Sequence, residues 1–236
     1  LVPGTEYWLG LSLTQAGDMP WGPGGSKVAW AQFLLPFQVP RQHRQPDTMH
    51  ALAVEETGVA VVVRGPEFYL TFDRGTGSIS DWRYQGRVVV RHGPQMNLWR
   101  APTDNDAKRL AARWQVAGLD RLQERARAVS VERLVPQVVR VRVDTADPRA
   151  GVTSRYDYLV FGSGDVVLEH TVELAGEFPP LPRVGVKLVL PGECQEFAWY
   201  GRGPHETYAD RKQGARVGVY RDGVRGQSMP YVTPQE

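Results

Sequence analysis

The stretch EFYLTFDRGTGSISDWRY, residues 67–84, contains the pattern that decides the fold. Two segments in which apolar and polar residues alternate, 67–73 and 78–84, flank the turn sequence DRGTGS. Alternation with a period of two is typical of a strand with one buried face, and clustered Gly and Asp mark a turn. The stretch therefore predicts two consecutive strands joined by a short connection.

The same pattern recurs along most of the chain, with turn sequences such as YQGR and FGSGD between the segments. The other predicted strands are 58–64, 87–91, 127–134, 137–145, 153–161, 165–174, 183–190 and 195–200. Only residues 106–118 have helical spacing, with Gly118 placed to end that helix. Many strands and one helix predict a mainly β fold, a large antiparallel sandwich. A barrel of alternating strands and helices, which needs about 250 residues, is excluded.

The N-terminal part has two strands of its own, EYWLGLSLT (6–14) and KVAWAQFLLPF (27–37). Two strands do not make a stable domain, so we expect residues 1–38 to be the end of a β-sandwich. A polar, proline-containing linker is predicted at 39–50, and the main sandwich at 51–236.

Composition narrows the class of protein. Of the 236 residues 42% are hydrophobic and 23% charged, which is typical of a globular protein. The net charge of +2, without a basic stripe, argues against a nucleic-acid binder. No apolar run is long enough to span a membrane, and Cys194 is the only cysteine, so we expect a protein of the reducing cytoplasm. Both end sequences look cut, so we expect a piece of a longer protein.

The segment NLWRAPTDND, residues 97–106, looks like a polar site. It gathers Trp99, Arg100, Asp104, Asn105 and Asp106 around a proline. In an extended segment Asp104 and Asp106 face one side at about 6–7 Å, near the separation of the two carboxylates of glycosidases. Aspartates before a helix more often cap it, and Asp106 is placed as an N-cap. We therefore favour capping over acid–base chemistry.

A second polar segment, WYGRGPHETYADRKQ, spans residues 199–213. His205 and Glu206, beside Arg202, have the composition of a proton-transfer unit. The segment also has a structural interpretation, in which GRGP is a turn and Asp210 pairs with Arg211. Residue types leave both interpretations open and favour the structural one.

The sequence predicts no metal site. The five histidines are scattered, at His43, His50, His92, His170 and His205. None belongs to a short cluster with the spacing of metal ligands. A serine-nucleophile signature is also absent from the sequence.

Together, NLWRAPTDND and WYGRGPHETYADR resemble the signature segments of bacterial β-galactosidases of glycoside hydrolase family 2, the lac-operon type. Their order and separation resemble the C-terminal, or small-chain, domain of that family. Residues 1–37 resemble the end of the immunoglobulin-like domain that precedes it. The resemblance implies a galactose-mutarotase-like supersandwich that is partial at its C-terminus.

The resemblance implies that the catalytic glutamates of a retaining β-galactosidase lie on a TIM barrel outside this chain. No catalytic residue is then expected here. It implies a supporting role, at the substrate site or a domain interface, for Arg100, Asp104, Asn105, Asp106, Arg202, His205 and Glu206. It also implies, as partners, the barrel domain or large chain, galactoside sugars and other subunits. No cofactor is expected in this chain, and the Mg and Na of the parent enzyme are expected on other domains.

Two departures from the family pattern limit the resemblance. The family has a longer mobile loop after TDND, whereas here a helix follows almost at once. The family domain also continues for about another third. Two alternatives remain open: a free-standing carbohydrate-binding module, and a mutarotase-like epimerase that uses His205 and Glu206.

Overall fold

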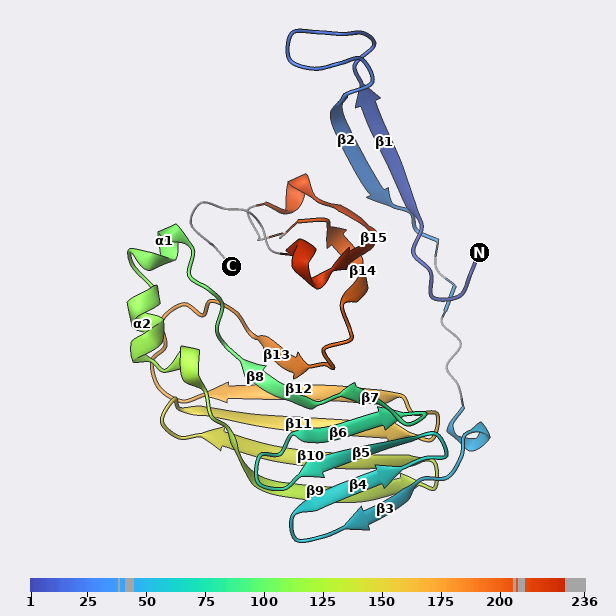
Figure 1. The fold of residues 1–236 in the computed structure, drawn as a ribbon, viewed down its shortest axis with the longest axis vertical. Coiled ribbons are helices and arrows are strands. Elements are labelled where there is room, and N and C mark those ends of the chain that lie inside the picture. The colour runs from blue at the N-terminus through green and yellow to red at the C-terminus, as the bar shows by residue number, and fades with distance from the viewer. Residues whose placement is uncertain (38, 41–44, 206, 208–210, 228–236) are drawn as a thin grey trace. The chain divides into compact units, whose positions relative to one another are not determined.

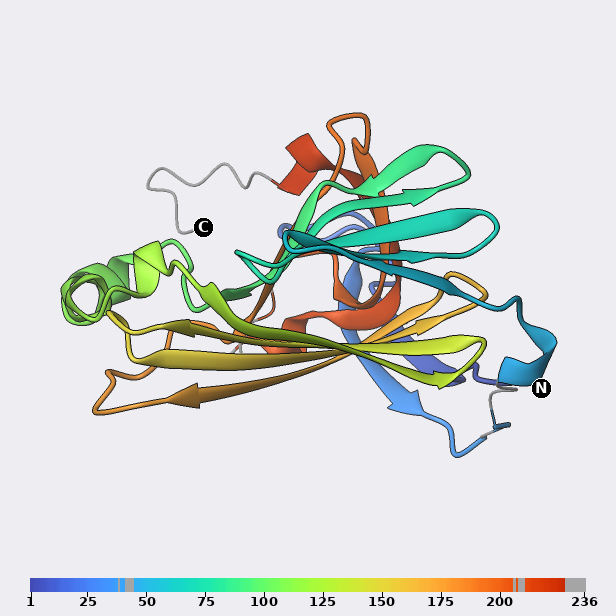
Figure 2. The ribbon, with the colours of Figure 1, turned by 90° about the horizontal axis from the view of Figure 1, so that it is seen from below.

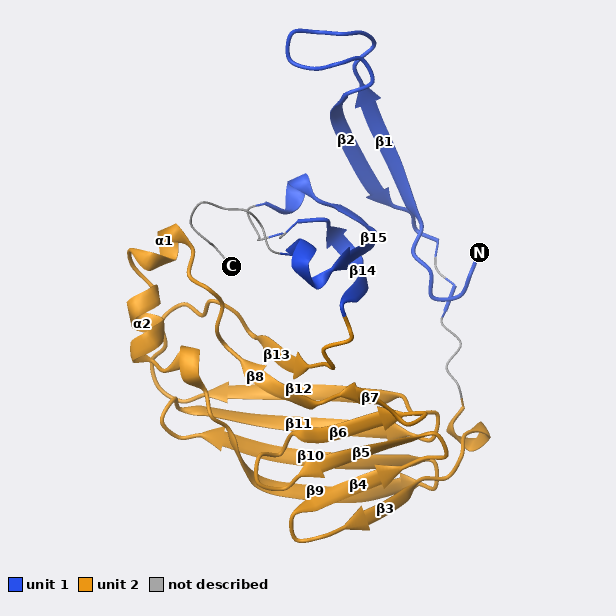
Figure 3. Cartoon of the chain, viewed as in Figure 1, with its two compact units in different colours: residues 1–44, 195–227 blue, residues 45–194, 228–236 orange. Residues whose placement is uncertain are grey.

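The computed structural model describes residues 1–37, 39–40, 45–205, 207 and 211–227 (Figure 1). The described chain divides into two compact units (Figure 3). Unit 1 contains Leu1–Arg44 and Gln195–Gln227, and unit 2 contains Gln45–Cys194. The predicted domain boundaries, 1–38, 39–50 and 51–236, stay a prediction.

Unit 2 contains two antiparallel sheets. The seven-stranded sheet has the order β13-β8-β6-β5-β4-β3, with β7 paired to β6. Its strands are β3 (Ala53–Glu56), β4 (Ala60–Arg64), β5 (Phe68–Asp73), β6 (Ile79–Tyr84), β7 (Arg87–Val90), β8 (His92–Asn97) and β13 (Gly185–Val189). The four-stranded sheet has the order β12-β11-β10-β9. Its strands are β9 (Arg125–Val135), β10 (Val138–Asp147), β11 (Val152–Phe161) and β12 (Val166–Leu174).

The two sheets of unit 2 are layered face to face (Figure 2). The apolar positions of the alternating segments point inward and form the main core. Its fully buried members include Val61, Val63, Leu70 and Phe72 from one sheet and Val139, Val141, Val143 and Val160 from the other. Burial of one face of each sheet is what a period of two requires. The predicted mainly β, antiparallel sandwich is confirmed.

The turn DRGTGS, which joins β5 to β6, is stabilised by the side chain of Asp73. Oδ1 of Asp73 accepts hydrogen bonds from the backbone N–H groups of Gly75 and Thr76 and from the Thr76 hydroxyl. Gly77 has φ = 75°, and a Cβ there would lie 2.5 Å from Cγ1 of Val143. Glycine is thus required for both backbone conformation and packing.

Replacing Gly77 with Ala should lower the free energy of unfolding by about 2–4 kcal/mol, because left-handed strain and overpacking add. Urea unfolding measures the loss. Gly58→Ala is the control, since no atom lies within 4 Å of a Cβ there, and it should change stability by no more than about 0.5 kcal/mol. Equal losses in both variants would contradict the packing role.

A second core cluster lies under two short helices at one end of the sandwich, α1 (Asp104–Ala107) and α2 (Ala111–Val116). The single helix predicted over 106–118 is therefore wrong in extent. Helix α1 begins earlier and ends at Ala107, and α2 begins only at Ala111. Gly118, with φ = 75°, follows α2 as predicted and leads into a 3-10 turn, η2 (Leu119–Arg121).

Unit 1 consists of two antiparallel hairpins. They are β1 (Trp8–Thr14) with β2 (Lys27–Leu34), and β14 (Glu196–Gly203) with β15 (Arg216–Gly223). The Gln32 side chain exchanges two 2.8 Å hydrogen bonds with the backbone of Val217, and the Arg216 guanidinium lies over the Trp30 ring. The remaining 3-10 turns are η1 (Pro46–Thr48), η3 (Lys212–Gly214) and η4 (Val224–Gln227). Among the described residues, no helix is both long and apolar enough to cross a membrane.

Candidate functional site

The segment TDND is fixed by a buried ion pair. The Arg100 guanidinium lies 2.7 Å from Oδ2 of Asp106, and the two side chains are 13% and 11% exposed. The same carboxylate oxygen accepts hydrogen bonds of 2.9 Å from the backbone N–H and the hydroxyl of Thr103. Three donors thus converge on one oxygen of Asp106, which the fold holds in one orientation.

Thr103, not Asp106, is the N-cap of α1. The Thr103 hydroxyl accepts from the backbone N–H of Asp106, and the Asp106 side chain accepts from the backbone N–H of Thr103. This reciprocal pair is a capping box, in which Asp106 is the third helical residue. The predicted N-cap position of Asp106 is therefore wrong, although its structural role in the helix start is confirmed.

Arg100 also ties this segment to a proline-rich loop. Its Nε donates to the carbonyl of Pro182, and its guanidinium lies over the ring of Trp114, 5.4 Å from the centroid. Trp114 is 1% exposed and donates from Nε1 to the carbonyl of Pro180 at 2.8 Å. Arg100 and Trp114 therefore join TDND, α2 and the loop into one packed corner of unit 2.

Asp104 and Asn105 have different surroundings from Asp106. Both are exposed at the start of α1, and Oδ1 of Asp104 accepts from the backbone N–H of Asn105. Asp104 and Asp106 thus do not form a carboxylate pair on one face of an extended segment. The carboxylate of Asp104 and the amide of Asn105 are thus open to solvent, whereas the carboxylate of Asp106 makes contacts within the corner.

Burial by itself would raise the pKa of Asp106. The hydrogen bonds from Thr103 and the charge of Arg100 outweigh burial, so that the pKa lies below its usual range. A carboxyl with a lowered pKa stays ionised at neutral pH and is not suited to donate a proton.

The lowered pKa predicts how stability depends on pH. A carboxyl whose pKa is lower in the folded state stabilises the fold fully above its unfolded pKa, about 3.9, and loses this contribution as pH falls through the folded value. We expect the stability difference between the wild type and Asp106→Asn to shrink as pH falls below about 4. Urea unfolding of both proteins from neutral to acid pH measures this difference. A difference that stays constant with pH would contradict the ion-pair role.

Of the predicted residues of the second segment, Arg202 and His205 are described, and they lie in unit 1. One nitrogen of Arg202 donates to the carbonyls of Lys212 and Ala215, each at 2.9 Å, and so braces the connection between β14 and β15. His205 is exposed. Glu206 and Asp210 lie outside the described residues. The structure therefore gives Arg202 a structural contact.

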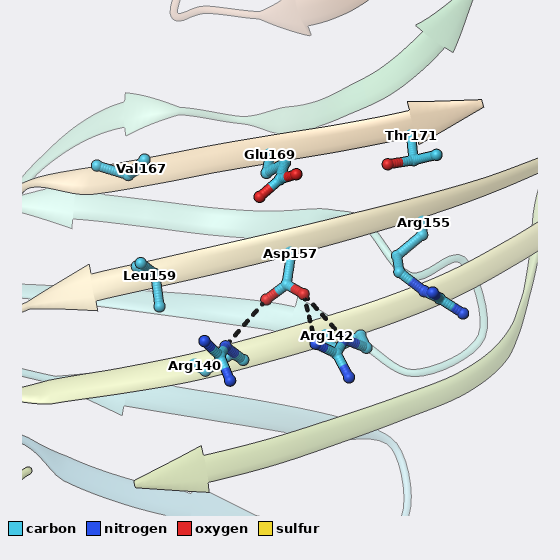
Figure 4. Close-up of a pocket in the computed structure, with 8 residues that line it drawn as sticks. All are labelled: Arg140, Arg142, Arg155, Asp157, Leu159, Val167, Glu169 and Thr171. Carbon is cyan, nitrogen blue, oxygen red and sulfur yellow. Dashed lines mark hydrogen bonds and ion pairs between the residues drawn. The ribbon is translucent and has the colours of Figure 1, made fainter. Parts of the chain in front are cut away.

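The outer face of the four-stranded sheet carries a hollow of about 400 Å³ (Figure 4). Its three arginines are all paired with aspartates of the same sheet. Asp157 accepts two hydrogen bonds from Arg142 and lies 3.3 Å from Arg140, and Arg155 pairs with Asp144. Its lining residues are Arg140, Arg142, Arg155, Asp157, Leu159, Val167, Glu169 and Thr171, with no aromatic ring for a sugar to stack on. These contacts are typical of a solvated ion-pair surface.

Sequence reasoning missed Thr103, Trp114, Pro180 and Pro182 as parts of the corner. The capping box had a visible signal, because Thr103 and Asp106 have the spacing of an S/T-x-x-D/E motif. No signal in the sequence indicated the contacts of the Pro180 and Pro182 carbonyls, because these residues lie in a loop far along the chain. Among the residues that the structure describes, no three His, Cys, Asp or Glu side chains are grouped so as to hold a metal ion.

Comparison with known proteins gives one consistent result. The family described as "Beta galactosidase small chain" matches residues 64–236. A β-galactosidase of Vibrio cholerae is 34% identical over 251 aligned residues, which cover 100% of this chain and 24% of the relative. One of Priestia megaterium is 30% identical over 232, covering 98% and 22%, and one of Kluyveromyces lactis is 28% identical over 241, covering 98% and 23%. The chain thus spans about a quarter of the length of these relatives.

Proposed function

Because this chain belongs to the β-galactosidase small chain family, we propose that it is a noncatalytic part of a β-galactosidase and supports the catalytic domain. The parent enzyme would hydrolyse terminal β-D-galactosides with retention, through a covalent glycosyl–enzyme intermediate formed by two carboxylates of a TIM barrel. That barrel would lie outside this chain. The work of the chain would be to pack against the barrel and shape the mouth of its active site.

The observation that carries this proposal is the buried Arg100–Asp106 pair. The pair uses the carboxylate of Asp106, the less exposed of the two aspartates of TDND, in contacts within the chain. Asp104 and Asn105 remain exposed at the capped start of α1. A fixed, exposed carboxylate and amide suit hydrogen bonding to a neighbouring domain or to a sugar hydroxyl. We therefore assign Asp104 and Asn105 to the domain interface at the substrate side, and Arg100 and Asp106 to their support.

The remaining parts of the proposal concern the whole enzyme. Its partners would be the barrel domain or large chain, galactoside sugars and further subunits. Arg202, His205 and Glu206 would support an interface. The Mg and Na ions of the enzyme would bind on other domains. With its single cysteine, the chain would suit the cytoplasm.

Removing the exposed pair tests this role in the whole enzyme. The double variant Asp104→Ala, Asn105→Ala should lower kcat/KM for an aryl β-galactoside about ten-fold, a loss of about 1.4 kcal/mol of transition-state stabilisation. Thermal unfolding should stay close to that of the wild type, because neither side chain belongs to a core cluster of unit 2.

The matched control is Lys108→Ala, an exposed change at the end of the same helix. It should leave kcat/KM unchanged. Equal kcat/KM for all three proteins would overturn the assignment of Asp104 and Asn105, and a loss in thermal stability alone would reduce it to a folding role.

A further inference from the structure

Glu124 is the centre of a polar cluster between the two sheets of unit 2. Its Oε1 accepts from the hydroxyl of Thr145 at 2.6 Å. Its Oε2 accepts from the hydroxyl of Tyr156 at 2.7 Å and from the backbone N–H of Met96 at 3.1 Å. The same N–H also donates to the Tyr156 hydroxyl, at 2.8 Å. Met96 lies on β8, and Thr145 and Tyr156 lie on β10 and β11. The carboxylate thus joins the seven-stranded sheet to the four-stranded sheet.

Three polar atoms around this cluster are buried without a hydrogen-bond partner among the described residues: the hydroxyls of Ser154 and Tyr158 and Nε2 of His170. The described chain has five such side-chain atoms in all, so most of them gather here. Ser154 and Tyr158 are 4% and 1% exposed. More than about 90% of buried polar groups are hydrogen bonded in folded proteins, so three exceptions around one cluster require an explanation.

The strand register places these three groups around the residues that hold Glu124. Ser154 is paired with Thr145, His170 is paired with Tyr156, and Tyr158 follows Tyr156 by two positions on β11. The ring of Tyr156 stacks on the His170 ring at 4.2 Å and on the Tyr158 ring at 6.2 Å. All three groups are therefore immediate neighbours of the cluster on the inner face of one sheet.

The ring of Tyr158 lies beside that of Tyr156, whose hydroxyl bonds Glu124. The two rings are stacked, with centroids 6.2 Å apart and planes within 11° of parallel. Glu124 uses three of the roughly four acceptor positions of a carboxylate, which leaves one on Oε1.

We propose that the sandwich of unit 2 binds ordered water around Glu124. One molecule bridges the Tyr158 hydroxyl to the Tyr156–Glu124 pair, and the same hydration satisfies Nε2 of His170 and the hydroxyl of Ser154. Buried waters make about three hydrogen bonds each, which these donors and acceptors supply. The hydration extends the contact between the two sheets beyond the three direct bonds of Glu124.

A crystal structure of the whole β-galactosidase that carries this chain tests the proposal directly. We expect an ordered water within about 2.6–3.2 Å of both the Tyr158 hydroxyl and an atom of the Tyr156–Glu124 pair. A direct hydrogen bond from Tyr158 to another protein atom, or no ordered water between these groups, would overturn it.

A variant gives an independent readout in solution. Tyr158→Phe should lower the ratio of folded to unfolded protein about five-fold, because the bound water loses one partner. Tyr156→Phe is the reference, since it removes direct bonds and must lower the ratio whether or not water is bound. If the Tyr158 hydroxyl had no partner, Tyr158→Phe would leave the ratio unchanged or raise it, and the proposal would fail.

Discussion

Replacing Arg100 with Ala should lower the free energy of unfolding by about 3–5 kcal/mol. The change leaves Asp106 as an uncompensated charge at a site where the side chain is only 11% exposed. It also removes the hydrogen bond to Pro182 and the contact with the ring of Trp114. Urea unfolding at neutral pH gives the value.

Arg140→Ala provides a matched control, because Arg140 pairs with acidic groups on the outer face and is 34% exposed. That change should cost at most about 1 kcal/mol. The double variant Arg100→Met, Asp106→Leu should be more stable than Arg100→Ala, since it leaves no unpaired buried charge. A small loss for Arg100→Ala, equal to that of Arg140→Ala, would contradict the role given to the buried pair.

Replacing Trp114 with Ala should also cost about 3–5 kcal/mol, since it empties the centre of the second core cluster. Trp114 is fully buried, packs edge-on against Trp99 and bonds the Pro180 carbonyl. The contact with Pro180 ties the proline-rich loop to α2. We therefore expect faster proteolysis of the loop in the variant as well as a lower urea midpoint.

Trp21→Ala is the control for Trp114. Trp21 is 77% exposed in a loop of unit 1, so its removal should change stability by no more than about 0.5 kcal/mol. If Trp114→Ala left the urea midpoint unchanged, the corner would not be a core of unit 2.

Alternation in the sequence was sufficient to predict most strands of unit 2, because each buries one face against the other sheet. It missed three described strands for local reasons. β8 contains HGPQMN and β15 contains RVGVYRDG, where Gly or Pro interrupts the pattern, and β3 has only four residues. These strands are defined by pairing with neighbours, which a periodicity within one segment does not reveal.

The corner was predictable only in part. Residues within one turn of each other, such as Thr103 and Asp106, have a sequence signature for their contact. The contact of Trp114 with Pro180 joins residues 66 positions apart, and no local pattern predicts it. The same holds for Glu124, whose partners come from three different strands.

The most direct test of the supporting role is an activity assay on separate pieces. The purified chain is added to a β-galactosidase fragment that lacks the corresponding C-terminal region, and hydrolysis of an aryl β-galactoside is measured. We predict hydrolysis in the mixture and none with the chain alone. Hydrolysis by the chain alone, or an inactive mixture in which the chain alone binds galactose, would contradict it, and the latter would favour a free-standing carbohydrate-binding module.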